Sequence, residues 1–410
     1  MLLLDKRSAR PRRLLLLLVL TLLLSGCWDR KEIEDMGFVL AMGVDKAEDE
    51  GHVGVTFQVA VPRTITGGGS GGGGGAAKQG AANAPPVMVE RVKQTTIYEA
   101  IRDLETFTNR RISLVQLRLV IVGRDLAKES VGEHLGLLTR QREIRQGIVV
   151  MMADGTAEEA LRANPVMEHD PSLFLEDLTR RAFERTARAP RVTLHQFLAN
   201  YEGKAQEPVL PIVRPYVTPT SLVGHAPEHK LQMAGTAVFR HDRLACDLSP
   251  QETQIMLMLT RRMRTLVERI PVPEMPGASL TIELSAESGS TKTDVSGPEP
   301  SFTVRLRTEG ELKEAERLPD SLVTPAGMKR LGEITARQLQ AEANALVSKF
   351  QKECNADAIG FGRELLPRFL DYRAWERYNW RSHFPKARIA IQVESFIRRA
   401  GMTVEKATPH

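Results

Sequence analysis

The sequence predicts an α+β protein with more than one domain. The chain has 410 residues, 42% of them hydrophobic, and a single hydrophobic core stops growing beyond roughly 250–300 residues. Strand patterns alternate with helical patterns over residues 37–152, which favours a mixed sheet with helices packed on it. In the last third, strands are followed by helices and then by one more strand. These observations favour two or three domains, each built on a β-sheet with packed helices.

Residues 1–26 have the three parts of a secretory signal peptide. Five basic side chains in residues 6–13 precede the apolar run Leu14–Leu24, which is far shorter than the about 20 residues that cross a bilayer. The segment closes with Leu24-Ser25-Gly26-Cys27, the pattern of a bacterial lipoprotein signal. We therefore expect cleavage before Cys27 and attachment of diacylglycerol to its thiol. The alternative is an ordinary signal followed by an accidental cysteine.

The net charge of the mature chain is close to zero. The full sequence has 56 basic and 51 acidic side chains, and residues 1–26 contain five of the basic ones and one acid. The mature part therefore has 51 basic against 50 acidic side chains, a net charge of +1. This balance gives no support for a nucleic-acid partner, and we predict none.

Residues 27–168 are predicted to form an N-terminal α+β domain. Its expected strands cover residues 37–44, 52–61, 87–93, 117–122 and 148–152, and its expected helices cover residues 97–107 and 131–138. Residues 63–86 include a glycine run, 67–75, that is interrupted only by Ser70. We predict that this stretch is a disordered loop within the domain.

The remainder is divided into a middle domain, residues 169–272, and a C-terminal α+β domain, residues 273–405. The middle domain should contain a helix over 171–188, a second near 194–201, and a hairpin over 233–247. Ser249-Pro250-Gln251-Glu252 is a capping box that should start a helix, and three prolines in residues 271–276 indicate a linker. Expected elements of the last domain are strands at 280–284 and 302–306, helices at 325–353 and 358–369, and a closing strand at 387–397.

Catalytic patterns are absent from the sequence. It has no HExxH, no Gly-x-Ser-x-Gly elbow and no complete dinucleotide fingerprint. The letters of the last two patterns occur only within the glycine run 67–75, without the strand and helix that either motif requires. His225 and His229 have a possible metal-ligand spacing, but Pro227 between them favours a solvated loop. The acid pair Glu158-Glu159 occupies an expected helix start, where acids are favoured without a catalytic role. We therefore predict a protein that is not an enzyme and that has no catalytic residues, no metal site and no cofactor.

Two further features leave alternatives open. Cys246 and Cys354 could form one disulfide in an extracytoplasmic compartment, but two buried free thiols are favoured. Six aromatic residues lie close together near the C-terminus, either as a partner-binding patch or, as we favour, as part of a core. They are Phe369, Tyr372, Trp375, Tyr378, Trp380 and Phe384.

Several stretches of the mature chain carry specific motifs. They are Cys27–Ile33 with Gly43–Asp45, the glycine-rich insertion, Arg111–Gly123 with Glu143–Val150, Gly235–Phe239 with Leu248–Glu252, and Asn355–Gly362 followed by Trp380 and Phe384-Pro385. In this order they resemble the C-subunit lipoproteins of spore germinant receptors, the Ger(x)C family. In the last motif we expect Asp357 to cap the helix 358–369. Gly360 and Gly362 are costly in a helix, so they should pack closely against the preceding long helix.

The resemblance implies a fold, a location and partners. The fold would be three small α+β domains, and the place would be the outer face of the spore inner membrane. There the chain would contact two integral-membrane subunits, A and B, of a nutrient receptor needed for germination. Only one site residue carries over, the lipid-bearing Cys27, and about nine residues between it and the first strand would keep the body within roughly 30 Å of the bilayer. The alternative function is an anchored solute-binding protein that captures the germinant itself.

Overall fold

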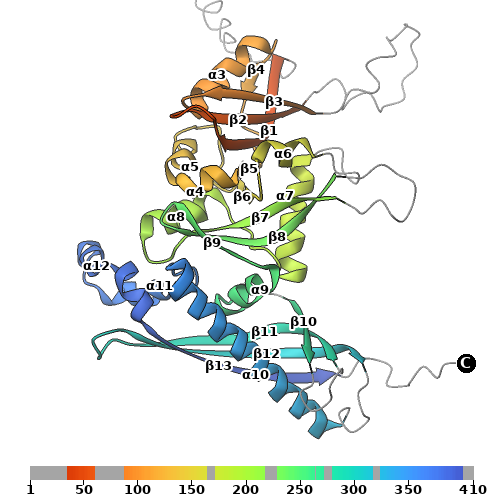
Figure 1. Cartoon of the computed structure of the whole chain (residues 1–410), viewed down its shortest axis with the longest axis vertical. Helices are drawn as coiled ribbons and strands as arrows, with labels where there is room; N and C mark the ends of the chain where they lie inside the picture. The colour runs from red at the N-terminus through yellow and green to blue at the C-terminus, as the bar shows by residue number, and fades with distance from the viewer. Residues whose placement is uncertain are drawn as a thin grey trace, which may run out of the picture.

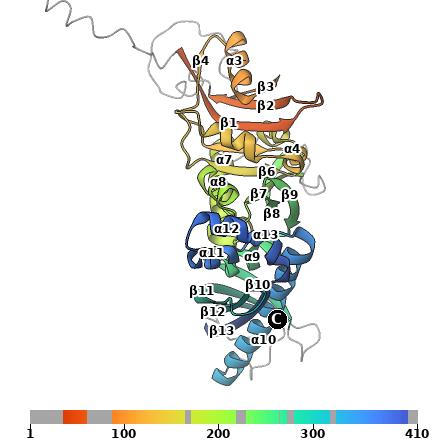
Figure 2. The same cartoon turned by 90° about the vertical axis from the view of Figure 1, so that its left-hand side faces the viewer.

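Two β-sheets and their surrounding helices form an elongated molecule. The computed structural model describes residues 35–60, 87–163, 171–217, 229–263, 265–271, 279–316 and 324–399. The first sheet occupies the upper part of the molecule in Figure 1 and the second sheet the opposite end, an arrangement that Figure 2 repeats from the side. The mixed α/β class expected from the sequence is confirmed. The signal peptide, the glycine-rich stretch 63–86 and most of the proline-rich linker lie outside the described residues.

The first sheet has parallel strands at its centre and antiparallel strands at its edges. Its order is β3-β2-β1-β5-β6-β7-β8-β9, with β4 beside the start of β1. The strands are β1 (Met36–Lys46), β2 (Val53–Ala60), β3 (Val87–Gln94), β4 (Arg111–Ser113), β5 (Leu119–Val122), β6 (Val149–Ala153), β7 (Val209–Val217), β8 (His229–Arg240) and β9 (Arg243–Leu248).

Helices cover both faces of the first sheet, so its central strands are buried throughout. Alternate residues of β5 belong to two different cores. Leu119 and Ile121 lie in the first core, and Val120 and Val122 lie in the second. The first core contains α6 and α7, and the second contains α3, α4, α5 and α8. These helices are α3 (Ile97–Phe107), α4 (Arg124–Glu129), α5 (Gly132–Leu138), α6 (Ala157–Arg162), α7 (Pro171–Arg181) and α8 (Leu194–Gly203).

The first sheet continues from the expected first domain into the expected middle domain. Strand β6 pairs with β7 through Met152 with Ile212 and Ala153 with Val213. We did not expect β7 from the sequence. It contains Pro211 and Pro215, and prolines are uncommon in strands with two neighbours. The structure accommodates Pro211 with a register shift between Pro211 and Val213 in the pairing with β8.

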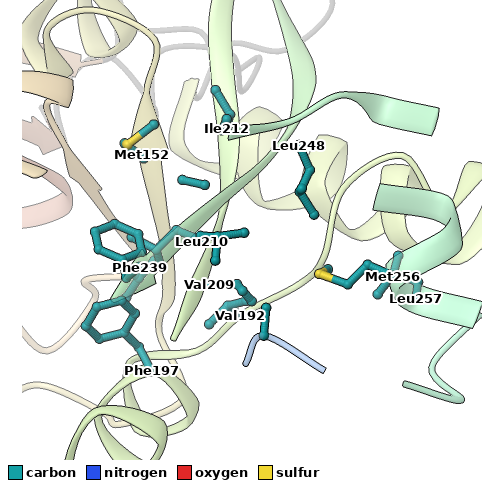
Figure 3. Close-up of a cluster of buried hydrophobic side chains, with 14 of the residues drawn as sticks. Met152, Val192, Phe197, Val209, Leu210, Ile212, Phe239, Leu248, Met256 and Leu257 are labelled. Carbon is teal, nitrogen blue, oxygen red and sulfur yellow. The ribbon is translucent and has the colours of Figure 1, made fainter. Parts of the chain in front are cut away.

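A buried cluster connects the end of the first sheet to the next helix, α9 (Pro250–Leu259). Figure 3 shows Phe197 and Phe239 at one end of this cluster and Met256 of α9 at the other. The two phenylalanine rings pack edge to face with centroids 5.4 Å apart. Helix α9 begins with the predicted capping box, in which Ser249 and Glu252 bind each other's backbone N–H.

The second sheet has the order β10-β11-β12-β13. Its strands are β10 (Leu266–Pro271), β11 (Ser279–Asp294), β12 (Ser301–Glu316) and β13 (Arg388–Arg399). The long helix α10 (Pro325–Lys349) lies between β12 and β13 in the chain, and it returns the chain so that β13 pairs with β12 in parallel. Leu280, Ile282 and Leu284 alternate toward the core, as their spacing predicted.

Three expected helices are shorter than the sequence suggested. The helix from residue 171 ends at Arg181 and the helix from residue 325 ends at Lys349, and each continues as one π-helical turn. The helix expected over 358–369 begins only at Phe361, because Gly360 has a left-handed φ of 95°. It is α11 (Phe361–Leu365), and it is followed by α12 (Tyr372–Tyr378) and α13 (Trp380–His383).

Candidate functional site

Several residues singled out in the sequence have no described site. Cys27 and His225 lie outside the described residues, and His229 opens strand β8. Among the residues that the structure describes, no group of three or more His, Cys, Asp or Glu side chains could hold a metal ion. In the same part of the chain, no helix has both the length and the apolarity needed to cross a bilayer.

The acid pair Glu158-Glu159 has a structural role at the start of α6. Glu159 forms a capping box with Thr156. Burial opposes ionisation of Glu158, but hydrogen bonds from Arg162 and Arg91 outweigh it and hold the pKa of Glu158 below its usual value. Glu159 therefore caps α6, and Glu158 ties the helix to Arg91 of β3.

The Gly43-Val44-Asp45 motif also positions α6. The Asp45 carboxylate is 3% exposed and accepts hydrogen bonds from the backbone N–H groups of Ala157, at 2.7 Å, and Glu158, at 3.0 Å. A Cβ atom at Gly43 would lie only 2.9 Å from the Ala157 Cβ. The motif thus allows α6 to lie directly on β1 with two of its N-terminal donors satisfied.

Cys246 and Cys354 form a disulfide, so our prediction of two free thiols is wrong. Their Cα atoms are 5.3 Å apart, although 108 residues separate them in sequence. Cys246 lies in β9, and Cys354 ends the π-helical turn after α10. The bond therefore links an edge of the first sheet to the long helix of the second. The separation in sequence concealed the pairing, which depends on how the two sheets are placed.

A buried carboxylate, Asp357, organises the same region from the second sheet's side. It is 3% exposed and accepts hydrogen bonds from the backbone N–H groups of Gly360, at 2.7 Å, and Gly362, at 2.9 Å, and from the Trp380 Nε1 at 2.9 Å. Burial raises the pKa of Asp357 to about 6, against these hydrogen bonds, which lower it. One side chain thereby holds the start of α11 and the start of α13.

The loop between α8 and β7 meets this segment from the first sheet. Gln206 Nε2 donates to the Ala358 carbonyl at 2.6 Å, and the Glu207 N–H donates to the Asp357 carbonyl at 2.8 Å. The buried Glu207 carboxylate pairs with Arg381 of α13. We call these contacts, together with the disulfide, the intersheet joint. Sequence analysis missed Gln206 and Glu207, since neither belongs to a recognisable motif.

Our expectations for Asp357 and its glycines need correction. Asp357 is not the N-cap of α11, because Gly360 occupies that position. From three residues earlier, Asp357 accepts the N–H of Gly362 in the first turn of the helix. A Cβ atom at Gly362 would lie 2.5 Å from both the Ala205 carbonyl oxygen and the Trp380 Cδ1. The glycines therefore pack against the loop after α8 and against Trp380, and not against α10 as we expected. The reason is the position of the first sheet, which the sequence did not reveal.

The aromatic cluster belongs mainly to the core, as we favoured. Trp375, Trp380 and Phe384 are between 1% and 3% exposed. Ring contacts connect them to their neighbours, with centroid distances of 5.3 Å from Phe369 to Trp375 and 5.7 Å from Trp380 to Phe384. Large aromatic area is thus used beside the intersheet joint rather than on the surface.

A carboxyl pair lies between β10 and α10. Burial, with repulsion from Glu342, raises the pKa of Glu268 to about 7, and Arg188 opposes this shift. Burial also raises the pKa of Glu342, whose carboxylate accepts a 2.6 Å hydrogen bond from Gln338. The pair makes the contact between β10 and α10 sensitive to pH.

A groove of about 790 Å³ runs between the first half of α10 and the second half of β13. Met328, Gly332 and Ala336 line its helical side, and Val393 and Phe396 line the strand. Its volume falls in the range of roughly 300–1,000 Å³ that is typical of ligand pockets. By contrast, a cavity beside Gly360 in the joint has only about 150 Å³. The joint is therefore a packing region, and the groove is the roomier of the two.

Comparison with a solved structure gives the fold class of the chain. The crystal structure of the GerBC protein has the same fold with a TM-score of 0.53, covering 89% of this chain and 99% of that chain at 16% sequence identity. At this identity the likeness establishes the fold alone. The chain is thus a two-sheet mixed α/β protein of the GerBC type.

Sequence comparison then gives the family. The family described as spore germination protein N-terminal domain matches residues 29–215, and the family described as spore germination B3/GerAC like, C-terminal, matches residues 234–401. The chain therefore belongs to the Ger(x)C family of spore germination proteins, as its motifs predicted. It is 24% identical over 399 residues to spore germination protein KC of Bacillus subtilis, covering 94% of this chain and 95% of that protein. It is 21% identical over 392 residues to spore germination protein GerQC of Bacillus cereus, covering 96% and 99%.

Proposed function

We propose that this chain is the lipid-anchored C subunit of a nutrient germinant receptor on the outer face of the spore inner membrane. One observation carries the proposal. The two family matches together begin at residue 29 and end at residue 401, so almost all of the sequence after Cys27 is family sequence. The lipoprotein signal Leu24–Cys27 supplies the anchor immediately before it.

We infer that the subunit acts by protein contact and not by catalysis. The buried carboxylates of Asp45, Glu207 and Asp357 are each occupied by backbone hydrogen bonds that fix local structure. Such groups are held in place as acceptors and are not open to a substrate. The expected partners are the integral-membrane A and B subunits of the receptor.

The intersheet joint gives this contact role a physical basis. The disulfide, the hydrogen bond from the Glu207 N–H to the Asp357 carbonyl at 2.8 Å and an ion pair from Lys349 to Glu252 at 2.7 Å connect the two sheets by independent interactions. A subunit tied in this way can hold partners at its two ends in a fixed relation. A change of position imposed at one sheet would then be passed to the other.

Germination of spores tests the proposal. The chromosomal copy is replaced by the Cys27→Ala variant, and ion release after nutrient addition is measured. The matched control is Gly26→Ala, which keeps the thiol and a small residue at the cleavage site. We expect Cys27→Ala to slow the response at least about tenfold and Gly26→Ala to leave it unchanged. Normal germination of Cys27→Ala spores would contradict the anchored-subunit proposal.

Capture of the germinant by this chain itself is the second candidate function. The 790 Å³ groove between α10 and β13 favours it, because its size suits a small solute. Calorimetry of the mature chain with amino acids and sugars separates the two functions. Saturable micromolar binding that is lost in Ala336→Trp, which fills the groove, would favour capture.

A further inference from the structure

Two neighbouring loops of the first sheet are rich in arginine. One is the segment 108–118, which includes β4, and the other is the segment 139–148 between α5 and β6. Six arginines stand against one acid, Glu143, in these two segments, which gives them a net charge of +5. The whole mature chain has a net charge near +1, so this concentration of positive charge is local.

The two loops are in direct contact, and four of their six arginines are exposed. The carboxylate of Glu143 accepts hydrogen bonds from Ser113 Oγ at 3.0 Å and from the Leu114 N–H at 2.7 Å, so the one acid is used to join the loops. Leu138 and Ile144 are buried and fix the second loop to the core.

Four of these arginines are exposed and have no ion-pair partner anywhere in the described part of the chain. They form what we call the arginine patch, which consists of Arg111, Arg140, Arg142 and Arg145. Elsewhere on the first sheet, arginines such as Arg91 and Arg124 are paired with acids. The patch is therefore free to bind an external anion.

The patch begins where the described chain enters the first sheet. Arg111 pairs in β4 with Met36, the first residue of β1, and Arg110 Nη1 donates to the Met36 carbonyl at 3.3 Å. Only nine peptide units separate Met36 from Cys27, a distance of at most about 30 Å. Figures 1 and 2 both place β4 at the end of the molecule farthest from the second sheet.

We propose that the arginine patch binds the anionic phospholipid headgroups of the bilayer that carries the acyl chains of Cys27. This inference rests on the anchoring in the proposed function. Guanidinium groups bind phosphate oxygens well, and an anionic surface attracts each nearby basic residue with a gain of about fivefold in affinity. The attraction decays within about 10 Å, so the short tether is needed to keep the patch within range.

A lipid surface fits the patch better than a folded partner does. The arginines lie on exposed loops, and headgroups require clustered charge without a complementary shape. The acyl chains hold the protein at the membrane, and the patch would set which side of the first sheet faces it. Partners would then meet the molecule in one orientation.

Vesicle cosedimentation tests the proposal with the whole mature chain carrying Cys27→Ala, which removes the acyl anchor. Vesicles contain either 40% phosphatidylglycerol in phosphatidylcholine or phosphatidylcholine alone, at roughly 50 and 300 mM salt. The test variant is Arg140→Glu, Arg142→Glu and Arg145→Glu together. The control, Arg337→Glu, Arg373→Glu and Arg377→Glu, changes the same charge on exposed, unpaired arginines of α10 and α12.

We expect binding to the anionic vesicles at low salt, little binding to the neutral ones, and a loss of at least about 100-fold in the test variant. The control should remain within about twofold of the parent. Absence of binding to anionic vesicles overturns the proposal. The same result is expected if the patch binds an acidic protein instead of lipid. Equal losses in both variants overturn it as well, since net charge would then be the cause. If mass spectrometry of the native protein finds Cys27 unmodified while the vesicle binding is as expected, the proposed anchoring is wrong and the proposed lipid binding of the patch stands.

Discussion

Replacing Asp357 by alanine should weaken the intersheet joint severely. The change leaves three buried donors, the N–H groups of Gly360 and Gly362 and the Trp380 Nε1, without their acceptor. A buried donor left unsatisfied costs about 1–3 kcal/mol, so we expect the free energy of unfolding to fall by about 3–9 kcal/mol. That is a large share of the 5–15 kcal/mol of a typical folded domain. Asp357→Asn, which retains one carbonyl acceptor, should fall between this variant and the parent.

Urea titration of the mature chain, followed by fluorescence of the buried tryptophans, measures this loss. The matched control is Asp371→Ala, which removes an exposed aspartate whose side chain accepts the Ala374 N–H at 2.7 Å as the N-cap of α12. Loss of an exposed N-cap costs about 1 kcal/mol. If Asp357→Ala lowers the urea midpoint no further than Asp371→Ala does, the hydrogen bonds of Asp357 do not hold the joint as we argue.

Three further predictions concern the rest of the structure. Removing the disulfide with Cys246→Ala and Cys354→Ala should lower the stability of the mature chain by up to about 5 kcal/mol, because the bond closes a loop of 108 residues; an unchanged thermal midpoint would contradict the bond's role in the joint. Glu268 has a folded pKa raised to about 7 from 4.5, so its contribution to stability is full below about pH 4.5 and is lost as the pH rises through 7. Partial solvation reduces the effect to on the order of 1 kcal/mol, and urea midpoints of Glu268→Gln should therefore fall less between pH 5 and pH 8 than those of the parent; parallel pH profiles would be inconsistent with this. Gly332→Ala should destabilise α10, since the new Cβ would lie 2.4 Å from a backbone carbonyl oxygen of β13, whereas Gly136→Ala in α5, with open space around it, should stabilise by roughly 0.5–1 kcal/mol. Melting temperatures that shift in the same direction for the two glycine variants would show that this packing is wrong.

Local signals in the sequence predicted many elements closely. The helix over 97–107 has the bounds that its apolar spacing indicated, with Thr96 as its N-cap. The capping box at Ser249 and the hairpin turning at His241-Asp242 are also where the sequence placed them. Each of these depends on residues within a few positions of one another, so tertiary structure had little to change.

Contacts between distant segments were not predictable from the same signals. Strand β7 contains two prolines, and only its place between β6 and β8 makes it a strand. The disulfide and the contacts of Gln206 and Glu207 with the Asp357 segment depend on how the two sheets meet. No periodicity or motif in one segment carries that information. The family resemblance identified the 355–362 motif, but only the structure showed which contacts its residues make.

The N-terminus of the native protein provides the most direct test of the account. Mass spectrometry of the protein extracted from spore membranes should find a chain that begins at Cys27, with diacylglycerol on its thiol. A full-length chain that retains residues 1–26, or a mature chain with an unmodified Cys27, would contradict the claim that this subunit works from a lipid anchor.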